Sequence, residues 1–205
     1  MNITHKLTKL GAAALLLCAA LAPATGWSAI SGTAHDLSGN AWGSTEKCVF
    51  CHTPHNAKTG QTVPLWNRAA TVATFTLYSS STLNATMGQP AGISKACLSC
   101  HDGTVAMDSF GNNTGTHLMT GSAKVGTDLS DDHPVSFTYD TALATADGSL
   151  VTPASASFVD AGHAVPLFAG KMECASCHDV HNNINAPFLR KSNSGSALCL
   201  TCHNK

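Results

Sequence analysis

Eight of the nine cysteines in this 205-residue chain form four pairs of the same spacing, and a histidine directly follows each pair. C-x-x-C-H is the attachment signature of c-type haem. Two thiols form thioether bonds along one edge of the porphyrin, and the adjoining histidine binds the iron. The four clusters are Cys48-Val49-Phe50-Cys51-His52, Cys97-Leu98-Ser99-Cys100-His101, Cys174-Ala175-Ser176-Cys177-His178 and Cys199-Leu200-Thr201-Cys202-His203.

Two other uses of paired cysteines explain less of this pattern. A zinc site or a redox-active disulfide requires only the thiols, and neither gives a reason for a histidine at the fifth position of every cluster. The sequence therefore predicts four covalently bound haem c groups, with His52, His101, His178 and His203 as the first axial ligands of the irons.

The histidines outside these motifs determine what the irons can do. An iron with an open sixth position binds substrate, whereas a second histidine closes that position and leaves electron transfer. Beyond the motifs and His5, six histidines are enough to cap four irons: His35, His55, His117, His133, His163 and His181. We therefore expect bis-histidine haems that carry electrons, and we assign no catalytic residues.

Two of the six occupy the same place in two motifs. His55 follows His52 by three residues, and His181 follows His178 by three. Residues three apart in a tight turn lie on the same side of it, about 5–6 Å apart at Cβ, so they cannot bind one iron from opposite porphyrin faces. We expect His55 and His181 each to reach a haem other than its own, the second and the fourth haem being nearest in sequence.

The choice of the other two distal ligands stays open on residue chemistry alone. They must come from His35, His117, His133 and His163. Aspartates adjoin His35 and His133, and a nearby carboxylate can orient an imidazole. His117 and His163 lie in Gly-rich stretches without such support.

The first 29 residues have the composition of a secretory signal peptide. Lys6 and Lys9 precede an apolar run over residues 10–22, and small residues follow. A basic start, an apolar stretch of about 7–15 residues and a small-residue exit define such a leader. We expect cleavage after Ala29, with Ala24 as the alternative. The mature protein is then exported to the periplasm, the outer cell surface or the extracellular medium.

Composition excludes several classes of protein. With 11 Lys+Arg against 12 Asp+Glu, the chain is not a basic nucleic-acid binder. No apolar run reaches the ~18 residues of an integral membrane span. Aromatic residues make up 6% of the chain, which is few for a separate side-chain core, so the porphyrins themselves should form the apolar centre.

The motifs fall into two couples, each beginning with C-x-x-C-H-x-x-H and ending with a plain C-x-x-C-H. This is an internal repeat. The repeat predicts a first dihaem module over 30–112 and a second over 169–205. A Gly/Asp/Ser/Ala-rich connector with a distal histidine joins them over 113–168, and the signal peptide over 1–29 precedes them.

The expected fold is a multihaem cytochrome c of low secondary-structure content with the haems as its core. Short helices should cluster at the motifs, near residues 94–100 and 196–203. Alternating apolar and polar residues predict a strand over 135–139, paired with 165–168, and a similar pattern covers 74–78. These strands would give one or two short β-hairpins.

Several stretches together resemble the small tetrahaem c-type cytochromes of metal-reducing bacteria with doubled C-x-x-C-H motifs, a group that includes filament-forming extracellular cytochromes. Besides the double signature over 174–203, they are GTAHDLS (32–38), CVFCHTPH (48–55), PLWN (64–67), CLSCHDGT (97–104) and DHPVSF (132–137). The resemblance implies respiratory electron transfer through bis-histidine haems of low potential, with His35 and His133 as the remaining distal ligands.

The same resemblance implies partners. These are redox proteins or extracellular electron acceptors, and in filament-forming relatives a distal histidine crosses into a neighbouring subunit's haem. His35 lies near the mature N-terminus, so we expect it in that role in a homopolymer.

The alternative function is a multihaem reductase with one open haem site, which needs an iron with a missing or unusual distal ligand. The chain has no C-x-x-C-K motif and enough histidines to close every iron, which favours the electron carrier. The sequence does not separate a soluble periplasmic shuttle from a surface filament, because both need the same haem chain.

Overall fold

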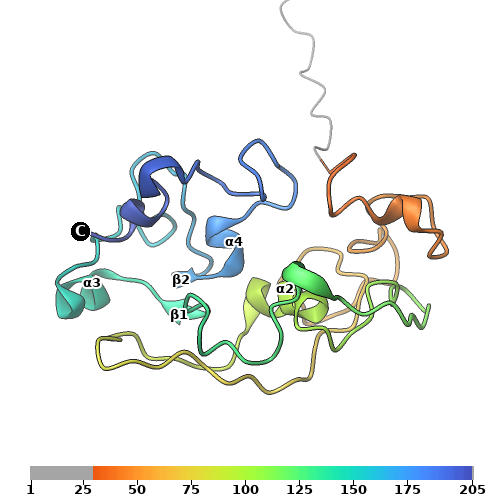
Figure 1. Cartoon of the computed structure of the whole chain (residues 1–205), viewed down its shortest axis with the longest axis horizontal. Coiled ribbons are helices and arrows are strands. Elements are labelled where there is room, and N and C mark those ends of the chain that lie inside the picture. Colours follow the sequence, from red (N-terminus) through yellow and green to blue (C-terminus); the bar gives the residue numbers. More distant parts are fainter. Residues whose placement is uncertain (1–29, 205) are drawn as a thin grey trace, which may run out of the picture.

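The computed structural model describes residues 30–204, so the expected signal peptide lies outside the described residues. Little of the chain is regular, as the sequence predicted (Figure 1). The elements are η1 (Leu37–Asn40), α2 (Gly92–His101), η2 (Gly121–Ala123), β1 (Phe137–Thr138), α3 (Thr141–Asp147), β2 (Lys171–Met172), α4 (Cys174–Cys177), η3 (Ser194–Ser196) and η4 (Cys199–Thr201). No helix in this part of the chain is long and apolar enough to cross a membrane.

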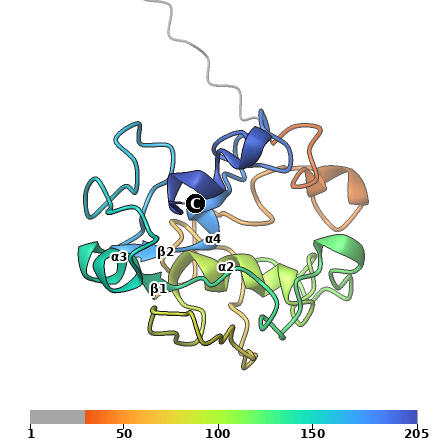
Figure 2. The ribbon, with the colours of Figure 1, turned by 60° about the vertical axis from the view of Figure 1, so that its left-hand side comes forward.

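The expected helices at the motifs are present in part. α2 contains the whole second motif, α4 holds the third, and the fourth forms only the 3-10 turn η4. α2 packs against α4. Seen from two directions, the N-terminal segment (orange) and the C-terminal segment (blue) lie on the same side of α2 (Figures 1 and 2).

The one sheet among the described residues is antiparallel, with Phe137 opposite Met172. The expected partner over 165–168 is wrong. A tight turn at Ala169 and Gly170, with φ of 52° and 74°, lets Phe168 and Lys171 exchange backbone hydrogen bonds of 3.0 and 3.1 Å, so the residues after the turn pair with β1 instead. The stretch 74–78 forms only an isolated bridge to Asp128. Because α3 lies between β1 and β2, they do not form a hairpin.

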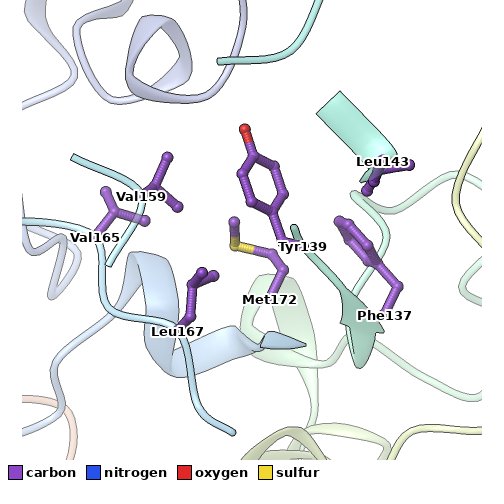
Figure 3. Close-up of a cluster of buried hydrophobic side chains, with 7 residues drawn as sticks. All are labelled: Phe137, Tyr139, Leu143, Val159, Val165, Leu167 and Met172. Carbon is purple, nitrogen blue, oxygen red and sulfur yellow. The ribbon is translucent and has the colours of Figure 1, made fainter. Parts of the chain in front are cut away.

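A separate side-chain core exists, contrary to the expectation from composition. Seven buried residues converge around β1 and β2: Phe137, Tyr139, Leu143, Val159, Val165, Leu167 and Met172 (Figure 3). All seven come from the chain between the second and third motifs. Their side chains bury one another, and Leu198 and Cys202 at the fourth motif pack against them. The Tyr139 hydroxyl donates to the carbonyls of Val151 (2.8 Å) and Cys202 (3.3 Å), which ties this core to the fourth motif.

Candidate haem-binding centres

Each motif closes one tight turn of backbone. The histidine N–H donates to the carbonyl of the first cysteine at 2.8 Å in the first motif, and at 3.0 Å in both the third and the fourth. The second motif forms the last turn of α2. Such a turn brings residues three apart onto one side. The two thiols of each motif can therefore reach one edge of a single porphyrin.

Backbone carbonyls orient three of the motif histidines. His52 Nδ1 lies 2.7 Å from the Pro64 oxygen, His101 Nδ1 2.7 Å from that of Ala123, and His178 Nδ1 3.1 Å from that of Pro187. A carbonyl only accepts, so Nδ1 carries the proton and donates. In a neutral imidazole this leaves Nε2 free to bind a metal, which is the arrangement of a metal-ligating histidine.

Three motif histidines each face a second imidazole. The ring centroids lie 6.2 Å apart for His52 and His181, 6.1 Å for His101 and His35, and 6.4 Å for His203 and His133. Two metal–imidazole bonds of about 2 Å each, together with the half-widths of the two rings, place the centroids on either side of one iron ~6 Å apart. All three pairs therefore match the spacing of two axial ligands.

These pairs place the distal candidates differently from their order in the sequence. His181 faces the first motif rather than the fourth, because the loop after α4 turns back toward the N-terminal segment, where Phe188 meets the ring of His35 at 4.7 Å. His35 occupies the position opposite His101 that we expected for His55. His133 lies opposite His203.

One motif histidine, His178, and one distal candidate, His55, do not take part in these three pairs. Within residues 30–204 no imidazole ring pairs with that of His178 at such a distance, although His35 lies near enough to interact with His178 electrostatically, and no motif histidine pairs with His55. His55 is exposed and lines an open cleft of about 380 Å³ with Phe110, Asn112 and Asn113.

The other two distal candidates, His117 and His163, contact other side chains. His117 stacks on Trp42 with centroids 4.9 Å apart, and its Nδ1 lies 2.7 Å from the Asp108 carboxylate. Burial opposes ionisation of Asp108, yet the hydrogen bonds from the side chain and backbone of His117 lower its pKa to about 2. His163 stacks on Phe158 at 4.3 Å.

Cysteines of successive motifs lie next to one another. Burial, with the neighbouring Cys100 thiol, raises the pKa of Cys51 to about 11. Cys97 and Cys174 share a hydrogen bond. Burial, with the nearby Cys177 thiol, raises the pKa of Cys202 to about 12. The four attachment sites therefore follow one another in space in the order of the sequence.

The donor set fits haem better than the other uses of cysteine. No disulfide links the eight cysteines of the described chain, and no group of three or more His, Cys, Asp or Glu side chains within residues 30–204 could hold a metal ion. Five of the thiols have raised pKa values, which makes them poor thiolates and poor redox nucleophiles: Cys51, Cys97, Cys100, Cys177 and Cys202. Attachment as thioethers requires neither property.

Three buried nitrogens also lack partners in the described chain: His35 Nδ1, Trp66 Nε1 and Arg68 Nε. Buried donors of this kind normally have an acceptor. His35 lies against His101, and Trp66 lies 6.4 Å from the ring of His52. The positive charge of Arg68 opposes the rise in pKa that burial causes in Cys51 and Cys100. All three lie beside the first and second motifs, whose cysteines and histidines would hold the haems.

Residues 166–205 match the family described as "Doubled CXXCH motif". This stretch contains the third and fourth motifs. No curated protein sequence matches the chain. The doubled motif implies a multihaem c-type cytochrome, and the pairs at 48/51 and 97/100 repeat the same spacing outside the matched stretch.

Sequence reasoning missed the groups that support the motif histidines. Arg68 and Glu173 are buried among the motifs, and the carbonyls of Pro64, Ala123 and Pro187 orient imidazoles. Isolated charges and backbone oxygens leave no periodic signal. Of these groups, only Pro64 belongs to a stretch that carries the resemblance, PLWN, which ends beside Arg68.

Proposed function

We propose that this chain is an exported tetrahaem c-type cytochrome that carries electrons along closely spaced bis-histidine haems in periplasmic or extracellular respiration. The observation that carries the proposal is the set of three histidine pairs about 6.1–6.4 Å apart at the first, second and fourth motifs. Two axial imidazoles close an iron to substrates and leave outer-sphere electron transfer. The haem supplies the redox chemistry, and the protein positions it and tunes its environment.

The test is a haem count and ligand state on the secreted holo-protein. Intact mass spectrometry should find four covalent haems on a chain without its leader. Electron paramagnetic resonance should find low-spin bis-histidine iron at the first, second and fourth motifs. Fewer than four haems, or high-spin iron at any of these three motifs, would refute the proposal.

The unmatched histidines support a homopolymer. His181, the second histidine of the C-x-x-C-H-x-x-H in the second repeat, lies opposite the motif histidine of the first repeat. His55 holds the same position in the first repeat, and within the described chain it faces no motif histidine, while His178 faces no distal one. We propose that His55 of one copy caps the haem of His178 in the next. His35, which we expected in this role, already lies opposite His101 in its own chain.

Such an interface joins two different surfaces and, unless it closes into a ring, builds a filament. His55→Ala should abolish filaments in electron micrographs and leave one carbon-monoxide-binding haem per chain. The matched control is His163→Ala, which should change neither property. Filaments and a wild-type spectrum in the His55 variant would contradict the assignment.

One observation also favours a second candidate. A chain that remains a monomer leaves the haem of His178 without a described histidine opposite it, which is the open site that a reductase needs. Carbon monoxide separates the two functions, because it should bind one haem of an enzymatic monomer and none in an assembled conductor.

A further inference from the structure

A buried cation lies between the first and second motifs. Arg68 is 1% exposed and donates through Nη1 to the carbonyls of Phe50 (3.2 Å) and Met107 (2.6 Å), and through Nη2 to that of Ala106 (2.5 Å). Within residues 30–204 no carboxylate lies within ion-pair distance of its guanidinium. In the described chain the guanidinium therefore donates to neutral carbonyls and forms no ion pair.

A buried anion lies between the second and third motifs. Glu173 is 3% exposed and accepts hydrogen bonds from Ser94 N (3.2 Å), Ser94 Oγ and Ser136 Oγ (2.9 Å). It also accepts the backbone N–H of Ser176 in the capping box of α4. No cation of the described chain lies within ion-pair distance of it.

Each charge lies beside particular attachment cysteines. Arg68 lies near enough to Cys51 of the first motif and Cys100 of the second for its charge to favour the ionised form of both thiols. Glu173 directly precedes Cys174, and Ser94, which donates to Glu173, accepts the Cys174 N–H at 2.9 Å. Charges in a protein interior are screened by salt far less than exposed charges are.

Other charges near these motifs do not remove this difference in charge between the first and third motifs. Asp102 is 2% exposed and acts on Cys100, so the second motif experiences charges of both signs. Arg190 acts on Cys177 but is paired with Asp179 at 3.2 Å. The first motif thus has an unpaired cation beside it and the third an unpaired anion.

We infer that Arg68 and Glu173 grade the reduction potentials along the haem chain, making the first haem the most easily reduced of the first three and the third the least. Reduction adds one negative charge to a haem, so a nearby cation stabilises the reduced form and a nearby anion the oxidised form. Electrons at equilibrium then gather at the N-terminal end of this segment. The inference rests on the proposed tetrahaem function and makes these two residues tuning groups.

The experiment compares charge-removing with charge-keeping variants of the holo-protein. Arg68→Gln and Glu173→Gln remove the charges, Arg68→Lys and Glu173→Asp keep them, and the exposed residues Lys58 and Glu46 serve as controls after change to Gln. Mass spectrometry first confirms four haems. Reductive titration followed by nuclear magnetic resonance of the haem methyl groups then gives the potential of each haem.

At a fixed potential, Arg68→Gln should raise the ferric-to-ferrous ratio of the first haem at least tenfold, which corresponds to about 59 mV for one electron. Glu173→Gln should lower the ratio of the third haem by a similar factor. The charge-keeping variants and the controls should stay near wild type.

Shifts of the same sign in both Gln variants, or shifts as large in Arg68→Lys and Glu173→Asp, indicate loosened structure and overturn the inference. So do four loaded haems with unchanged potentials, a result that leaves the proposed function intact. If Arg68→Gln fails to load four haems, the Glu173 pair decides by the same criteria.

Discussion

The ring of His181 lies 6.2 Å from that of His52, with the two planes 23° apart. One belongs to the loop after the third motif and the other to the first motif, so the second histidine of one repeat faces the motif histidine of the other. Because the covalent haem and its two ligands form one unit, this contact would close the chain between its N-terminal and C-terminal parts.

His181→Ala should open the first haem and leave the fourth closed. Removing the imidazole opposite His52 leaves that iron with one histidine, whereas His133 continues to face His203. Carbon-monoxide difference spectra should find one additional open haem per chain, assigned to the first motif by nuclear magnetic resonance. His163→Ala is the control. Opening of the fourth haem would disprove the pairing.

The core beside β1 and β2 should contribute to stability independently of the haems. Leu167 is 5% exposed within it, and truncating such a side chain leaves a cavity. Leu167→Ala should lower the free energy of unfolding by about 2–5 kcal/mol, measured by denaturant titration of the holo-protein. Val72 is 95% exposed, so Val72→Ala should change it by less than about 0.5 kcal/mol. Equal effects of the two variants would contradict the presence of a packed core.

Tyr139 connects this core to the fourth motif. Tyr139→Phe removes the hydroxyl that donates to the carbonyls of Val151 and Cys202. We expect a loss of about 0.5–1.5 kcal/mol and a lower Tm, with the haem count unchanged. Tyr78→Phe, at the other tyrosine, is the control. A Tm equal to that of wild type would show that neither hydrogen bond matters to stability.

Asp108 should make the protein less stable in acid. Its pKa is lowered to about 2 in the folded state, against about 3.9 in an unfolded chain, so folding favours the ionised form. This contribution is fully present above about pH 4 and is lost as the pH falls toward 2. Between pH 5 and pH 3 the free energy of unfolding should fall more steeply for wild type than for Asp108→Asn. Parallel pH profiles of the two proteins would refute this role.

How much of the site the sequence could predict depends on how far apart in the chain the cooperating residues lie. The motif residues are set by covalent attachment to one porphyrin edge, which needs only five consecutive residues. The distal partners depend on how the chain doubles back, so sequence distance favoured the fourth haem for His181, whereas the structure places His181 opposite His52 of the first motif. His35 and His133 came from a resemblance, and each now lies opposite a motif histidine.

The fold shows the same division. The helix near residues 94–100 was predictable because the motif itself turns there. The pairing of β1 with β2 was not, because it depends on the backbone at Ala169 and Gly170, where both residues have positive φ. Val159 and Val165 show no periodicity in the sequence, so their shared core emerged only in three dimensions.

Electron cryo-microscopy of the purified holo-protein tests the central claim most directly. The account predicts four haems per chain in motif order, with His181 on the first iron, His35 on the second, His133 on the fourth, and His55 of a second copy on the third. An image in which any of the first, second or fourth irons lacks its second imidazole would contradict it.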